Sequence, residues 1–505
     1  MENSCRVEAR ALRRAHRLLA AGLFLVAGCR RHVAPPTPQW TDIGLAPQDR
    51  LLILAPHPDD EVLCCGGIIQ QAVARGVPVR VVFFTYGDNN QWSFLLYRKH
   101  PVFLPSGIRK MGLVRHDEAV AATNALKLSP EHLTFLGYPD FGTLQIWRNH
   151  WGDQAPFRSM LTRVTQVPYA NALRPGAAYK GEEIVQDLTT ILRDVRPTKV
   201  FISHPGDYMP DHAALYLFTR IALWDVESEM RPELYPYLIH FKRWPKPRGF
   251  CPTELLQPPI AFKSDNVTWH SHLLSQSEVE QKRIAVRAHR TQYAYSAAYL
   301  LSFVRPNELF GDFPVVRLEQ STLPARLSPN AGMPPEEEEA PEQLTYEERG
   351  VFVGLEERSV RLDNGALVLS VQFSRPLAAA VKASVFVFGY RPDRPFAQMP
   401  KLHLVFGELH HETFDQDRRL PNGTVHVTRE RKSLTIRIPL NVLGDPQRVL
   451  TSASTYLGDV PLDWAAWRTL DLGAAPTLVL AQPPVPPAPA SESALPPASS
   501  SPSAQ

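Results

Sequence analysis

Cysteine is scarce in this chain, which has 505 residues and five cysteines. Cys5 and Cys29 lie near the N-terminus, and the other three are Cys64, Cys65 and Cys251. Adjacent cysteines are poor partners for each other, so the spacing gives no disulfide framework. We expect Cys64, Cys65 and Cys251 to act as small buried apolar residues.

Positive and negative charges nearly balance, because the chain has 54 Lys and Arg residues and 51 Asp and Glu residues, a formal net charge of +3. Part of that small excess is an arginine group between Arg6 and Arg17. No basic patch indicates a nucleic-acid partner. Hydrophobic residues make up 44% of the chain, enough for a sizeable core, and the length suits two or three domains.

A long apolar run is also missing near the N-terminus, where Leu18–Gly28 is too short to cross a bilayer as a helix. Basic residues precede it, and Val26–Cys29 follows the pattern of a bacterial lipoprotein signal. We therefore expect residues 1–28 to be a signal peptide and Cys29 to be lipidated, with residues 29–45 as a tether. That predicts a lipid-anchored protein of the bacterial cell envelope, in the periplasm or at the outer membrane. An ordinary secretory signal or a short membrane anchor stays open.

The most informative stretch is an apolar run that stops abruptly in a polar cluster. Leu51–Ala55 ends at Pro56, and His57, Asp59 and Asp60 follow at once. Ionised carboxylates are rarely buried without a partner or a metal. The acidic residues alone would suit a helix N-terminus, but that interpretation leaves His57 unexplained.

Strand and helix patterns alternate over residues 46–330, the first predicted domain. Alternation of this kind predicts an α/β, Rossmann-like parallel sheet with helices on both faces, whose ligands lie beyond the carboxyl ends of the strands. The predicted strands are Leu51–Ala55, Val79–Thr85, Leu133–Tyr138 and Lys199–Ser203, and the predicted helices are Val62–Arg75, Arg115–Leu126, Glu182–Val195 and one that begins near His212.

A second strand end carries the same residue types, since Lys199–Ser203 leads to His204, Asp207 and His212. Two such ends can face one crevice. His57, Asp60 and His212 would then supply two imidazoles and one carboxylate, a set that suits Zn²⁺ as cofactor and leaves positions open. Asp59 is the natural acceptor for a proton from the attacking water. His212 alone could equally be a surface histidine at a helix start.

These motifs resemble those of the PIG-L and LmbE-like zinc-dependent N-deacetylases, over roughly residues 48–318. The stretch His57–Glu61 matches the family's first motif, and Asp207 to His212 matches most of its second. Supportive similarity continues in Arg115 to Glu118, in Phe135–Asp140 and in Lys282–Phe310.

By this resemblance, His57, Asp60 and His212 are the zinc ligands and Asp59 is the general base. Arg115 and Asp140 are implied substrate contacts, although Arg115 could also be a salt-bridge partner on a helix face. The resemblance implies removal of acetyl groups from an N-acetylated amino sugar, within a glycan or glycoconjugate.

One position departs from the family pattern, because Met209 stands where the family usually has histidine. A thioether cannot donate a proton or carry charge. His204 and His289 are the catalytic residues predicted to compensate for it.

Aromatic residues gather near the predicted strand ends and could stack on sugar rings or simply pack a long loop. These residues are Trp92, Phe94, Tyr97, Phe141, Trp147 and Trp151.

The character of the chain changes at residues 331–349, an acidic Pro/Glu linker. Residues 350–473 then alternate with period two, which predicts an all-β sandwich-like domain. It resembles a carbohydrate-binding sandwich, and Trp464 and Trp467 could form a sugar platform or belong to its core. Residues 474–505 are rich in Pro, Ala and Ser, and we expect them to be disordered.

The sequence therefore predicts an N-deacetylase of an acetylated amino sugar. Two alternatives stay open: an amidase of another small N-acyl glycoside conjugate, and a non-catalytic glycan-binding protein with a degenerate site.

Overall fold

The computed structural model describes residues 41–89, 104–264, 267–311, 314–319, 323–327, 345, 349–377, 380–458 and 460–473. The predicted signal peptide, most of the tether and of the linker, the C-terminal tail, and Trp92, Phe94 and Tyr97 lie outside these residues. Among the helices in the described ranges, none has both the length and the apolar composition that crossing a membrane requires.

Seven strands form the sheet of the first domain, in the order β3-β2-β1-β4-β5-β7-β6. The five strands from β3 to β5 are parallel, as predicted, whereas β7 runs antiparallel to both of its neighbours. The sheet is therefore mixed at one edge. Its strands are β1 (Leu51–Ala55), β2 (Val79–Thr85), β3 (Leu133–Tyr138), β4 (Lys199–Ser203), β5 (Glu233–Tyr237), β6 (Trp269–Leu273) and β7 (Asn307–Gly311).

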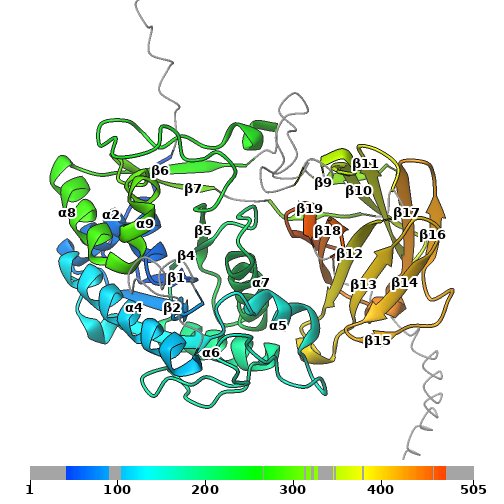
Figure 1. The fold of residues 1–505 in the computed structure, drawn as a ribbon, viewed down its shortest axis with the longest axis horizontal. Coiled ribbons are helices and arrows are strands. Elements are labelled where there is room, and N and C mark those ends of the chain that lie inside the picture. The colour runs from blue at the N-terminus through cyan, green and yellow to red at the C-terminus, as the bar shows by residue number, and fades with distance from the viewer. Residues whose placement is uncertain are drawn as a thin grey trace, which may run out of the picture. The chain divides into compact units, whose positions relative to one another are not determined.

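Helices cover both faces of this sheet. α2, α4 and α8 pack against one another on one side, and α5, α6 and α7 pack on the other (Figure 1). Helix α4 begins at Pro105, earlier than the predicted start at Arg115. The helices are α2 (Asp60–Ala74), α4 (Pro105–Ala125), α5 (Thr143–Asn149), α6 (Gly181–Val195), α7 (Pro210–Asp225), α8 (Gln276–Ala288) and α9 (Arg290–Leu301).

The pair β1 and β4 positions the polar clusters. Every residue of both strands is buried, as expected for central strands covered on two faces. The strands are neighbours in the order 3-2-1-4-5, so the point where the strand order reverses lies between them. Ligands of open α/β sheets bind at this point, beyond the carboxyl ends of the strands. The residues that follow β1 and β4 therefore meet there.

Two further sheets form the β-rich domain, in the orders β16-β17-β11-β10-β9 and β15-β14-β13-β12-β18-β20-β8, with β19 paired to β18. Apolar residues that alternate along β11, β12 and β17 meet in one core. The strands are β8 (Val316–Arg317), β9 (Ala325–Leu327), β10 (Leu355–Asp363), β11 (Ala366–Phe373), β12 (Val381–Tyr390), β13 (Lys401–Phe406), β14 (His411–Asp415), β15 (Arg418–Arg419), β16 (His426–Arg429), β17 (Ser433–Pro439), β18 (Arg448–Leu457), β19 (Val460–Trp464) and β20 (Arg468–Asp471).

The β-rich domain includes two strands that lie before the predicted domain boundary at residue 330. Strand β9 pairs with β10, and β8 pairs with β20. The described residues from Asp42 onward belong to one compact unit. The segment that leads into the linker is therefore part of the second domain's sheets.

Several of the aromatic residues that could either stack on sugar rings or pack in the core are buried where α5 contacts the β-rich domain. The ring of Trp147 lies 5.3 Å from that of Phe396 and 6.0 Å from that of Trp467. Trp147, Trp151 and Trp467 are all buried, and Trp464 is half-buried at the end of β19. Packing, and not an exposed sugar platform, accounts for these three buried rings.

Candidate metal centre and active site

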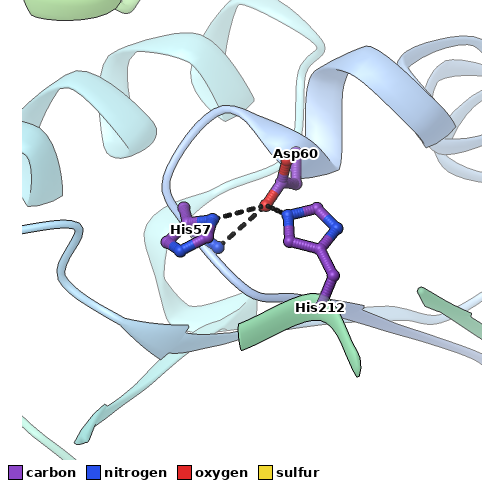
Figure 2. Close-up of side chains that lie close together, drawn as sticks. All are labelled: His57, Asp60 and His212. Atoms are coloured by element: carbon purple, nitrogen blue, oxygen red, sulfur yellow. Dashed lines mark hydrogen bonds and ion pairs between the residues drawn. The ribbon is translucent and has the colours of Figure 1, made fainter. Parts of the chain in front are cut away.

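The residues predicted as metal ligands meet at the carboxyl ends of β1 and β4. His57 follows β1, Asp60 opens α2, and His212 lies in the first turn of α7 (Figure 2). Oδ2 of Asp60 lies 3.2 Å from Nδ1 of His57 and 3.2 Å from Nε2 of His212. All three side chains are buried, and their ligand-type atoms lie within 4.8 Å of one another.

Both imidazoles are backed by further carboxylates. Nε2 of His57 lies 3.2 Å from Oδ1 of Asp140 and 3.3 Å from Oδ2 of Asp211. Nδ1 of His212 lies 3.1 Å from Oδ2 of Asp207. Carboxylates in these positions fix the tautomer and the orientation of ligating histidines. The layout therefore leaves Nδ1 of His57 and Nε2 of His212 directed at Asp60.

The donor set fits a divalent cation. Nε2 of His212 and Oδ2 of Asp60 are both buried and face each other at 3.2 Å, which suits two atoms that share one cation. Burial opposes charge on the imidazoles, yet the surrounding carboxylates raise the pKa of His212 to about 9 and that of His57 well above its usual value. Burial alone would raise the pKa of Asp60, but His212 and His57 hold it well below its usual range. A bound cation would replace these protons as the counter-charge.

Asp59, the predicted general base, lies beside the ligand cluster in a constrained turn. Its φ of 134° is rare for a residue other than glycine. Its backbone N–H donates to Oε2 of Glu61 at 2.9 Å, and its Oδ1 lies 3.5 Å from the Arg115 guanidinium. Burial raises the pKa of Asp59 to about 7, against the opposing charge of Arg115. A carboxylate of this kind can accept a proton near neutral pH.

A cavity of about 150 Å³ opens beside the cluster. One of its walls holds Phe141, which is 47% exposed and has a φ of 58°, a strained conformation for a bulky residue. The backbone N–H of Phe141 donates to Oδ2 of Asp211 at 2.6 Å, which holds the residue in place. The described residues that line the cavity are His57, Asp59, Asp60, Leu63, Arg115, Asp140, Phe141, Met209, His240, Gln292, Tyr295, Ser296, Tyr299 and Leu300.

Arg115 and Asp140, the predicted substrate contacts, line this cavity but are already engaged by the protein. Arg115 donates to the carbonyls of Gly87 at 2.8 Å and Pro58 at 2.6 Å. Asp140 faces His57 and accepts from the backbone N–H of Asn89 at 2.8 Å. Both side chains therefore hold the loop that carries the cluster.

His204 and His289, predicted to compensate for Met209, are not among the described residues that line the cavity. Nδ1 of His204 accepts from the N–H of Gly206 at 2.9 Å, and its ring stacks on that of Trp269. Nε2 of His289 lies 3.0 Å from Oε1 of Glu61, the carboxylate whose other oxygen holds Asp59. His289 thus supports Asp59 from behind, whereas His204 packs in an aromatic environment.

Asp207 and His240, which lie near the cluster, had no predicted role. Asp207 joins His212 to the turn at Ile239 and His240, and it is fully buried. His240 lines the cavity and follows β5, a strand that the sequence pattern did not reveal because Pro236 interrupts it. A histidine that follows a third parallel strand of the sheet is the sequence feature that could have identified His240.

Residues 52–223 match the family model described as PIG-L, GlcNAc-PI de-N-acetylase. The chain is 29% identical over 260 residues to a 1D-myo-inositol 2-acetamido-2-deoxy-alpha-D-glucopyranoside deacetylase of Mycobacterium sp. strain KMS, an alignment that covers 49% of this chain and 75% of the relative. A deacetylase of the same description from Nocardia farcinica is 30% identical over 190 residues, 35% of this chain and 54% of the relative.

Among solved structures, an N,N'-diacetylchitobiose deacetylase from Pyrococcus horikoshii is 18% identical, with a TM-score of 0.32, and the match covers 52% of this chain and 84% of that one.

Proposed function

Residues 52–223 form a domain of the PIG-L family of de-N-acetylases, and from this premise we propose that the protein removes the N-acetyl group of an acetylated amino sugar. The protein is a hydrolase of amide bonds. The observation that carries the specific reaction is the cluster of His57, Asp60 and His212 beside Asp59, at the base of a cavity.

Zn²⁺ is the proposed cofactor, with His57, Asp60 and His212 as its ligands. Two imidazoles and one carboxylate are a donor set that catalytic zinc takes while it keeps a position open. When bound, Zn²⁺ would polarise the amide carbonyl and make water more acidic.

The side chains around this centre have separate tasks. Asp59 accepts a proton from the attacking water as the water oxygen bonds to the carbonyl carbon, and this proton passes to the amine nitrogen as the C–N bond breaks. Arg115 holds Asp59 and the loop that carries it. Asp140 and Asp211 orient His57. The products of the reaction are acetate and a free amine.

The substrate class is an N-acetylated amino sugar within a glycan or glycoconjugate. The relatives described above are named for a glycoside of inositol, which supports an N-acetylglucosamine unit as the part that enters the cavity. Phe141, exposed on the cavity wall, offers an aromatic face to the sugar ring. A small N-acyl glycoside conjugate uses the same groups and belongs in any substrate panel.

The proposed location is the bacterial cell envelope, with lipid attached to Cys29 after removal of residues 1–28. The support for this location is the sequence pattern of Val26–Cys29 behind a basic and an apolar stretch.

Acetate release by the purified protein tests this function. The panel holds N-acetylated chitooligosaccharides and an inositol-linked N-acetylglucosamine, each with and without a chelator. Asp59→Asn should abolish release and keep the metal, whereas His57→Ala and His212→Ala should lose both. Full metal content in both histidine variants would refute the ligand assignment, and an inert wild type that still binds the sugars would favour a glycan-binding protein.

A further inference from the structure

His240 reaches the cavity from the turn that follows β5. Its ring lies edge-on to the ring of His212, with centroids 4.8 Å apart, and it lines the same cavity as Met209. Neither of the two clusters of metal-ligand side chains found among the described residues includes His240. The ring thus stands next to the proposed metal centre without belonging to it.

One carboxylate holds both the backbone at His240 and the ring of His212, a proposed metal ligand. Oδ2 of Asp207 accepts from the N–H of Ile239 at 3.1 Å and from the N–H of His240 at 2.9 Å. The same oxygen lies 3.1 Å from Nδ1 of His212. Because Asp207 is fully buried, it fixes the two histidines relative to each other.

The hydrogen bonds around His240 also decide which ring nitrogen carries hydrogen in the neutral imidazole. The Tyr299 hydroxyl donates to the carbonyl of Ile239 at 2.8 Å. Its oxygen lies 3.2 Å from Nδ1 of His240, so this oxygen accepts and Nδ1 is the donor. Nε2 then keeps its lone pair and is a hydrogen-bond acceptor.

Three of the other ionisable groups that line the cavity are held by neighbouring groups of the protein. Both nitrogens of His57 face carboxylates, the Arg115 guanidinium holds two carbonyls, and Asp140 is held by His57 and Asn89. Met209 offers only a weak acceptor. His240 is therefore the imidazole in the described cavity wall that is placed to contact a substrate.

We propose that His240 is a catalytic residue that accepts a hydrogen bond through Nε2 from the N–H of the substrate's acetamido group, and that Tyr299 is the positioning residue that fixes its ring. This inference rests on the proposed function. A hydrogen bond to the amide N–H holds the amide plane in one orientation, so the carbonyl carbon stays within reach of the water that Asp59 activates.

The test compares four metal-loaded proteins on N,N'-diacetylchitobiose: wild type, His240→Ala, Tyr299→Phe and the double variant. His240→Ala should lower kcat by roughly 10²-fold and raise KM, because the bound substrate loses a contact, while metal content stays close to wild type. Tyr299→Phe should lower kcat by a smaller factor. It should add nothing in the His240→Ala background, because Tyr299 acts through His240. His426→Ala, at an exposed position of β16, is the control and should be neutral.

Unchanged kcat in His240→Ala, loss of metal from it, or additive effects in the double variant would overturn the inference. If the wild type releases no acetate, the proposed function fails, and binding of N-acetylglucosamine then decides about His240. Saturation-transfer NMR should show the acetyl methyl bound to the wild type and weakened in His240→Ala. An equal signal in both proteins, or none in the wild type, would overturn the inference.

Discussion

Replacing Asp207 with asparagine should weaken both the metal centre and the fold around it. The carboxylate accepts from three backbone N–H groups, those of Met209 at 3.0 Å, Ile239 at 3.1 Å and His240 at 2.9 Å. It also lies 3.1 Å from Nδ1 of His212. Asparagine keeps one acceptor oxygen and replaces the other with an amide that only donates.

The magnitude follows from these contacts. If the remaining oxygen faces Ile239 and His240, the N–H of Met209 faces another donor, and an unsatisfied buried group costs about 1–3 kcal/mol. Loss of the carboxylate behind a ligating histidine typically lowers metal affinity about 10- to 100-fold. That range corresponds to about 1.4–2.7 kcal/mol of binding free energy.

Two measurements separate these effects. Competition with a fluorescent zinc chelator gives the metal affinity, and denaturant unfolding of the metal-free protein gives the change in stability. Asp153→Asn, at an exposed position, is the matched control and should leave both quantities unchanged. A metal affinity of Asp207→Asn equal to that of the wild type would refute the role assigned to Asp207.

Three further predictions concern separate parts of the chain. Arg115→Lys should lower kcat by roughly 10²-fold with the metal retained, because lysine cannot hold two carbonyls and Asp59 together; an unchanged kcat would contradict this positioning role. Burial lowers the pKa of Lys401 from 10.5 to about 7, so the unfolded chain binds more protons between these pH values and stability should rise with pH there, by up to about 1.4 kcal/mol per pH unit. Lys401→Met should flatten that rise in urea unfolding midpoints, and a slope equal to that of the wild type would argue against the shift. Cys29→Ser should release the protein from the membrane fraction, and a wild type found soluble and without lipid would refute the anchor.

Local sequence information was enough to place the centre of the first domain. The apolar run Leu51–Ala55 can only be a buried strand, and Pro56 ends it, so the polar residues that follow lie at the edge of the sheet. The predicted bounds of β2, β3 and β4 agree with the structure for the same reason. Two strand ends with histidine and aspartate thus predicted that His57, Asp60 and His212 would meet, and they do.

Positions whose environment depends on distant segments were not predictable in this way. The sequence does not distinguish a buried tryptophan from one that stacks on a sugar at the surface. Only the packing between α5 and the β-rich domain shows that Trp147 and Trp467 are buried. The short strands β8 and β9 have no pattern of their own and exist because β20 and β10 offer them partners.

The sequence by itself determined the residue types of the proposed metal centre and the topology that gathers them, because both follow from short runs with strong local preferences. Only the tertiary structure decided which groups surround that centre. His240 follows β5, a strand that Pro236 makes hard to recognise in the sequence. Asp207 binds backbone groups about thirty residues away in the chain, and Tyr299 lies in α9, the last described helix of the first domain. Such contacts join segments that are far apart in sequence, and no local preference encodes them.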